Sequence, residues 1–167
     1  MSAKFVFCSF LATMAMVLPG CDSNVAGPGP AAAGAPLTPA ELAKADDEAA
    51  KDLLDDKTHI AEAKDWLSPN HENHVLWKGD RKAITQLVND LYEAGATKIW
   101  AADTNEMGKN QIVAMFVAEL PTDKDKRAKV FEVHNNFWKK AGGSAEDVAE
   151  FLIEEQGQKY ILLDFDN

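Results

Sequence analysis

Two histidines three residues apart, His71 and His74, are the pair whose spacing is most suggestive of metal chemistry in this sequence. On a helix, side chains three residues apart share a face and could bind one metal ion, and Glu72 between them could assist. The pair does not form an HExxH motif, and it follows Ser68-Pro69, which favours a loop. A structural zinc site needs further ligands, which the spacing does not supply. We therefore expect a solvated loop here and no metal or other cofactor.

Three acidic residues and one histidine could carry acid–base chemistry. Asp103 follows a predicted strand, Glu106 lies in the turn after it, and Asp164 lies near the end of the last strand. Paired carboxylates with separated pKa values could act as acid and base if they met at one edge of a sheet. His134 falls on the apolar face of a predicted helix, where a buried structural histidine is the simpler interpretation. An enzyme of unidentified reaction that uses these residues is the alternative to a non-catalytic protein.

Other classes of function find no support in the sequence. It contains no G-x-S-x-G or S-x-x-K motif and no glycine-rich phosphate loop. Both cysteines, Cys8 and Cys21, precede the predicted folded part, which therefore has no thiol for a disulfide, a zinc site or a nucleophile. With 27 acidic and 17 basic residues the net charge is −10. Such a chain is repelled by phosphate groups, so we expect no binding to nucleic acid.

The residues around Cys21 predict an exported protein that carries lipid. Lys4 is followed by an uncharged apolar run, residues 5–17, which is shorter than the roughly 20 residues that span a bilayer. Such a run is typical of a signal peptide. The next four residues, Leu18-Pro19-Gly20-Cys21, resemble the lipobox of bacterial lipoproteins, except that Pro19 stands where a small or β-branched residue is usual.

The resemblance covers the first 21 residues and implies a membrane anchor. Residues 1–20 would be the signal peptide, cleaved after Gly20, and Cys21 would carry a diacylglyceryl group and further acyl chains such as palmitate. More than one chain is needed for stable anchoring in the bilayer. In enterobacterial lipoproteins an Asp directly after the cysteine, as Asp22 is here, favours the inner membrane. Residues 21–37, rich in Gly, Pro and Ala, would be a tether that holds the folded part off the bilayer.

The remaining residues predict one acidic helix and one α+β domain. Residues 38–57 begin with a capping box, Thr38 and Glu41, but contain few large apolar residues, so we expect a loosely docked helix. Residues 58–167 are enough for a single domain with one core. Their apolar spacing predicts, in order, a helix at 59–67, a strand at 73–78, a helix at 80–94, strands at 98–102 and 111–118, a helix at 122–141, a short helix from 144 and a strand at 159–165.

This order, β-α-β-β-α-β, predicts the ferredoxin-like split βαβ arrangement, with helices on one face of the sheet and one or two helices before it. The opposite face would be open, and small residues on the strands would let a partner approach closely: Ala101, Ala102, Ala114 and Ala118. We therefore expect a non-catalytic envelope lipoprotein, anchored in the bilayer through Cys21. Its folded domain would bind an envelope protein or a small ligand, or form a homodimer, through the sheet face or the region 68–80.

Overall fold

The computed structural model describes residues 38–75, 81–141, 148–149 and 151–165. The expected signal peptide and tether, Gly20 and Cys21 included, lie outside these ranges. The helices are α1 (Pro39–Asp55), α2 (Ala63–Trp66), α3 (Arg81–Ala94) and α4 (Lys124–Ala141). The strands are β1 (Ile60–Glu62), β2 (His74–Val75), β3 (Lys98–Ala102), β4 (Asn105–Met107), β5 (Asn110–Val113), β6 (Met115–Glu119) and β7 (Tyr160–Asp164). In this part of the chain, no helix is both long and apolar enough to cross a membrane.

The α+β class is confirmed, with antiparallel pairing throughout the main sheet. Its strand order is β1-β3-β6-β7, and each neighbouring pair is antiparallel. A split βαβ unit would instead place another strand between two parallel strands joined by a helix. Here β1 and β3, which α2 and α3 connect, are adjacent and antiparallel. The strands therefore follow one another in chain order, and the ferredoxin-like order is not found.

The first strand of the main sheet lies where the sequence predicted a helix. Residues 59–67 have apolar side chains at helical spacing, but Ile60–Glu62 form β1 and only Ala63–Trp66 are helical. Ile60 pairs with Ala102 and Glu62 with Trp100, so ladder hydrogen bonds to β3 replace the first helical turn. Ala63 is fully buried and Leu67 is 5% exposed, so the same apolar residues reach the core from a different backbone.

A second, smaller sheet extends from the middle of the chain. Its order is β2-β5-β4, with β2 parallel to β5 and β4 antiparallel to it. The predicted strand 111–118 is thereby divided at Ala114, because β5 joins this sheet while β6 joins the main one. Gly108, at φ +68°, lies in the tight turn between β4 and β5. The predicted strand 73–78 is described only as far as Val75, the end of β2.

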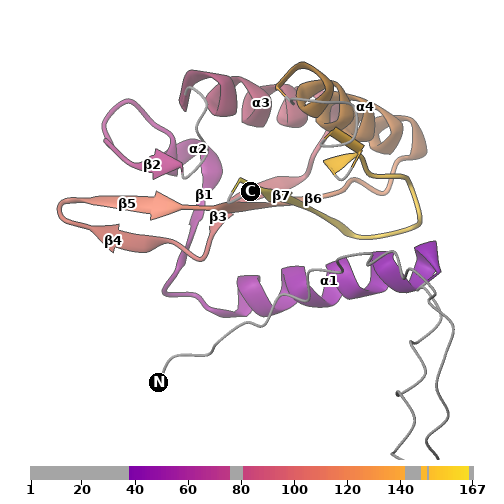
Figure 1. Ribbon diagram of the computed structural model, residues 1–167, viewed down its shortest axis with the longest axis horizontal. Helices are drawn as coiled ribbons and strands as arrows, with labels where there is room; N and C mark the ends of the chain where they lie inside the picture. The colour runs from indigo at the N-terminus through magenta and orange to yellow at the C-terminus, as the bar shows by residue number, and fades with distance from the viewer. Residues whose placement is uncertain (1–37, 76–80, 142–147, 150, 166–167) are drawn as a thin grey trace, which may run out of the picture. The chain divides into compact units, whose positions relative to one another are not determined.

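Helices cover both faces of the main sheet (Figure 1). The larger buried cluster, on the side of α3 and α4, takes alternate strand residues such as Ile99, Phe116 and Leu163. The smaller cluster lies under α1 and consists, in the described chain, of Ala50, Leu54, Ala102, Val117 and Tyr160. The expectation of an open sheet face is therefore wrong, because α1 packs on it.

Small residues explain how a helix with so few large apolar side chains docks on the sheet. Ala50 and Ala102 both have no exposed surface, which lets α1 lie close to the strands. The predicted capping box is confirmed at the start of the helix. Glu41 Oε2 accepts from the Thr38 N–H at 2.8 Å, and Thr38 Oγ1 accepts from the Glu41 N–H at 3.3 Å. Of the four alanines expected to receive a partner, Ala102 packs against this helix, whereas Ala101 and Ala118 belong to the larger cluster on the opposite face.

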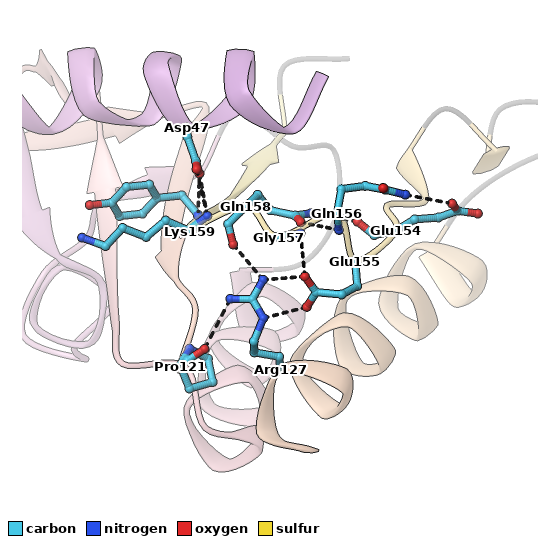
Figure 2. A network of polar contacts seen from close by, with 10 residues as sticks. Asp47, Pro121, Arg127, Glu154, Glu155, Gln156, Gly157, Gln158 and Lys159 are labelled. Carbon is cyan, nitrogen blue, oxygen red and sulfur yellow. Dashed lines mark hydrogen bonds and ion pairs between the residues drawn. The ribbon is translucent and has the colours of Figure 1, made fainter. Parts of the chain in front are cut away.

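Arg127, in the first turn of α4, fixes the segment that leads into β7 (Figure 2). Its Nε and Nη2 donate to the two carboxylate oxygens of Glu155 at 2.7 and 2.6 Å. Nη2 also donates to the Gln158 carbonyl oxygen at 2.8 Å, and Nη1 donates to that of Pro121 at 3.3 Å. The hydrogen bond from Arg127 lowers the pKa of Glu155 below its ordinary value. One side chain therefore joins the β6–α4 connection to the approach to β7.

Candidate functional site

A groove of about 460 Å³ opens between α2, the loop before β2 and the β4–β5 hairpin. The side chains that border it are mostly polar: Asp65, His71, Glu106, Lys109, Asn110 and Gln111. They offer carboxylates, an imidazole, an ammonium group and two amides within one hollow. Such a lining can recognise a polar ligand by hydrogen bonds from several directions.

Three side chains hold the floor of the groove in place. Trp66 Nε1 donates to Gln111 Oε1 at 2.9 Å, across a separation of 45 residues. Asn73 Nδ2 donates to the Trp66 carbonyl oxygen at 3.0 Å, and Asn73 Oδ1 accepts from the Gln111 N–H at 2.9 Å. Trp66 and Asn73 are only 3% and 7% exposed. Because this buried network is satisfied within the protein, the floor of the groove is formed without a ligand.

Arg81, the first residue of α3, holds the loop that forms one wall. Its Nη1 donates to the His71 carbonyl oxygen at 2.6 Å, and Nη2 donates to that of Ser68 at 3.1 Å. The loop is further closed by the His71 N–H, which donates to the Ser68 carbonyl oxygen at 3.1 Å. Because the planar guanidinium of Arg81 binds two backbone carbonyl groups, it orders the loop and leaves the loop's side chains unoccupied by this contact. The side chain of His71 thus remains at the groove.

The two histidines of the sequence motif do not act together. His71 borders the groove, whereas His74 begins β2 and pairs with Ile112 of β5. In the ranges that the structure describes, no group of three or more His, Cys, Asp and Glu side chains could hold a metal ion. His71 lies in a loop and His74 in a strand. The two imidazoles therefore do not share a helix face, which the metal-binding interpretation of their spacing required.

Asp103 and Glu106 both lie close enough to an exposed histidine, His59, for their charges to act on it. The Nδ1 of His59 is 2.7 Å from the Thr104 carbonyl oxygen. This hydrogen bond raises the pKa of His59 above its ordinary value, and the negative charges of Asp56, Asp103 and Glu106 add to the effect. All of these ionisable side chains are exposed to solvent. Water screens the charges of exposed groups, so these side chains lack the low-dielectric surroundings that make a catalytic pair effective.

His134 lies in the core, as its place on an apolar helix face predicts. It is 1% exposed, its Nε2 accepts from Trp138 Nε1 at 3.1 Å, and its Nδ1 is 3.0 Å from Asn135 Oδ1. Burial lowers the pKa of His134 to about 4, and the hydrogen bond with Asn135 only partly offsets this. The imidazole is therefore neutral and has both nitrogens in use.

Asp164 is separated from His134 by the sheet. By strand alternation it shares the face of Tyr160 and Leu162, which α1 covers, whereas His134 belongs to α4 on the other face. Of the four proposed acid–base residues, the structure thus gathers only Asp103 and Glu106, on an exposed surface. The side chains that form the groove floor were not predicted individually, since their partners lie 38 and 45 residues away. The sequence indicated only the region 68–80.

No known protein family, curated protein or solved structure matches this chain.

Proposed function

We propose that the protein is a lipid-anchored protein of the bacterial envelope whose folded domain binds a polar ligand or protein segment without catalysing a reaction. The observation that supports binding is the Trp66–Asn73–Gln111 network, which builds a groove ahead of any ligand. A preformed site avoids the entropy cost of ordering its walls when the ligand arrives. The polar border favours an occupant that carries hydrogen-bond donors and acceptors, such as an extended peptide or a saccharide.

The arrangement of ionisable groups argues against the enzymatic alternative. His134 is enclosed by protein and neutral, so it cannot exchange protons with a substrate. Asp103 lies outside the lining of the groove, and Glu106 is exposed at its border. General acid–base catalysis needs such groups within hydrogen-bonding reach of one reacting atom. A binding role requires none of this.

The anchor rests on the residues around Cys21. An apolar run too short to span a bilayer, followed by Leu18-Pro19-Gly20-Cys21, fits lipid attachment at the cysteine. The net charge of −10 would keep the domain away from anionic headgroups, so a covalent lipid is a suitable means of holding it at the membrane. The proposed location is therefore the outer leaflet of the inner membrane, with Asp22 as the basis for that choice.

The two cysteines provide a matched test of the anchor. We expect Cys21→Ser to abolish acylation and to release the protein from the membrane fraction. Cys8→Ser, which changes the segment proposed to be removed, should leave both unchanged. Mass spectrometry of the mature amino terminus reads out the modification directly. An unmodified thiol at position 21 in the native protein would refute the lipid anchor.

The groove can be tested by photocrosslinking in living cells. A photoreactive amino acid at position 110 should capture the ligand, whereas the same residue at Gln86, exposed on α3, should not. Asn73→Ala should weaken the capture, because the Gln111 N–H and the Trp66 carbonyl group both lose their partner. Equal capture at both positions, or capture that is indifferent to Asn73, would argue against the groove as the binding site.

A further inference from the structure

The side-chain amide of Gln111 has a fixed orientation in the groove. Trp66 Nε1 can only donate a hydrogen bond, so the Gln111 atom that lies 2.9 Å from it must be the amide oxygen. The amide nitrogen, Nε2, is therefore the other end of this group, and no hydrogen bond among the described residues uses it. Because Gln111 lines the groove, the two N–H groups of Nε2 are available to a ligand.

Asn73 has an orientation that is fixed in the same way. Its Oδ1 accepts from the backbone N–H of Gln111, and its Nδ2 donates to the backbone carbonyl oxygen of Trp66. An N–H and a carbonyl group cannot exchange these roles, so the oxygen and nitrogen of Asn73 cannot be interchanged. Both amide oxygens of the floor thus already accept a hydrogen bond, whereas N–H groups remain. The floor of the groove therefore offers mainly donors, and a ligand must bring an acceptor oxygen to it.

Two carboxylates at the border of the groove have no cation of their own. Asp65 of α2 and Glu106 of β4 both line the groove and are exposed. None of the ion pairs formed among the described residues includes either of them. The lining also holds one ammonium group, that of Lys109. The two negative charges outweigh it, and the net charge of −10 adds to the attraction for a cationic group on the ligand.

The register of the β4–β5 hairpin places a donor and a carboxylate next to each other. Glu106 pairs directly with Gln111, so the two side chains lie on the same face of the smaller sheet. The Cβ atoms of such cross-strand neighbours are about 5 Å apart. A complementary ligand therefore carries an acceptor oxygen and a cationic group close to each other.

We propose, on the basis of the binding function above, that the occupant of the groove is an extended segment of a partner protein that contains a Lys or Arg. A main-chain carbonyl oxygen of the segment accepts from Gln111 Nε2, and the neighbouring basic side chain lies at the carboxylates of Asp65 and Glu106. A neutral saccharide could accept from the amide but has no charge for the carboxylates. An anionic ligand would be repelled by them.

Variants that change charge but not shape test the sign of the ligand's charge. The measurement is capture in living cells by the photoreactive amino acid at position 110. Asp65→Asn and Glu106→Gln should each reduce capture about threefold, and both together about tenfold, as expected for contacts made by exposed charges. Lys109→Gln removes a repulsion and should increase capture. Glu132→Gln, exposed on α4 and outside the groove lining, is the matched control and should change nothing.

Mass spectrometry of the crosslinked peptide identifies the captured segment. We expect a Lys or Arg within a few residues of the attachment point. Capture that rises in Glu106→Gln and falls in Lys109→Gln would mean an anionic ligand, and capture that no charge variant changes would mean a neutral one. Either result would overturn the basic segment as the ligand but leave the proposed binding function standing. Absence of any capture at position 110 would refute both.

Nuclear magnetic resonance of the wild type gives a second measurement that needs no variant. The protein is the labelled full chain isolated in mild detergent, and the probes are acetyl-Ala-Arg-Ala-amide and the same peptide with citrulline, whose neutral urea group has nearly the shape of a guanidinium. The arginine peptide should shift the side-chain NH₂ signals of Gln111, and the citrulline peptide should bind about tenfold more weakly. Added salt should reduce this difference. Equal affinities, or Gln111 signals that do not move, would overturn the proposal.

Discussion

His134 is a neutral residue of the core, and its burial makes stability depend on pH. The unfolded chain binds the histidine proton near the ordinary pKa of 6.5, but the folded chain binds it only near 4. Between these values the unfolded state holds more protons, so stability should fall as the pH is lowered from about 6.5 to about 4, by up to about 3 kcal/mol. Denaturant unfolding at several pH values measures this slope.

His134→Gln isolates the contribution of the histidine. The amide oxygen of glutamine can still accept from Trp138 Nε1, but the side chain does not titrate. We expect the variant to lose less stability than the wild type over the same interval. Glu155, whose pKa is lowered by Arg127, and His59, whose pKa is raised by its bond to Thr104, titrate in both proteins and cancel in the comparison. Equal slopes would show that His134 does not titrate as its burial implies.

Among the connecting elements, the Arg127–Glu155 pair is the ion pair that should matter most for stability. The guanidinium forms a two-pronged contact with the carboxylate and binds two carbonyl groups, and its side chain is 15% exposed. Arg127→Lys keeps the positive charge but cannot form the paired hydrogen bonds to both oxygens of Glu155. We therefore expect the free energy of unfolding to fall by about 1–2 kcal/mol. Chemical unfolding measures it. Lys44→Met is the matched control, because the Lys44–Glu48 pair is 77% and 64% exposed and should cost at most about 0.5 kcal/mol.

Periodicity predicted the elements that bury one face in regular alternation. α3, α4, β3 and β7 lie where apolar spacing placed them, and Gly95 ends α3 with φ +116°. The prediction was wrong where one pattern fits two structures. The apolar residues between Ile60 and Leu67 suit a helix, yet Ile60–Glu62 pair with β3 as a strand. The pairing between strands, and hence the strand order, depends on contacts far apart in sequence that local spacing does not encode.

The candidate site was less predictable than the fold for the same reason. Trp66, Asn73 and Gln111 meet through hydrogen bonds that span 38 and 45 residues, and none of the three belongs to a recognisable motif. The two histidines with the spacing of metal ligands are divided between a loop, which holds His71, and a strand, which begins at His74. The sequence shows which residues could carry chemistry, but only the folded structure shows which of these residues line the same groove.

Across the whole domain, the main sheet separates a large buried cluster from a small one. The large cluster joins α2, α3 and α4 to one face, whereas the small one holds α1 to the other through Ala50 and Leu54. Burial of one leucine and a few alanines stabilises such a contact by on the order of 3 kcal/mol. α1 should therefore be able to leave the sheet while the larger cluster stays folded, as local unfolding units do.

Ala50→Asp tests this separation of the two layers. An unpaired carboxylate at a position with no exposed surface costs more than the contact of α1 provides, so the helix should leave the sheet rather than bury the charge. We expect fast hydrogen exchange along Pro39–Asp55 and a more exposed Trp100, with slow exchange retained in α3 and α4. Ala45→Asp, on the exposed side of α1, should leave the helix protected. Loss of protection throughout the variant would mean instead that the sheet folds only with α1 in place, and that the two clusters form one cooperative unit.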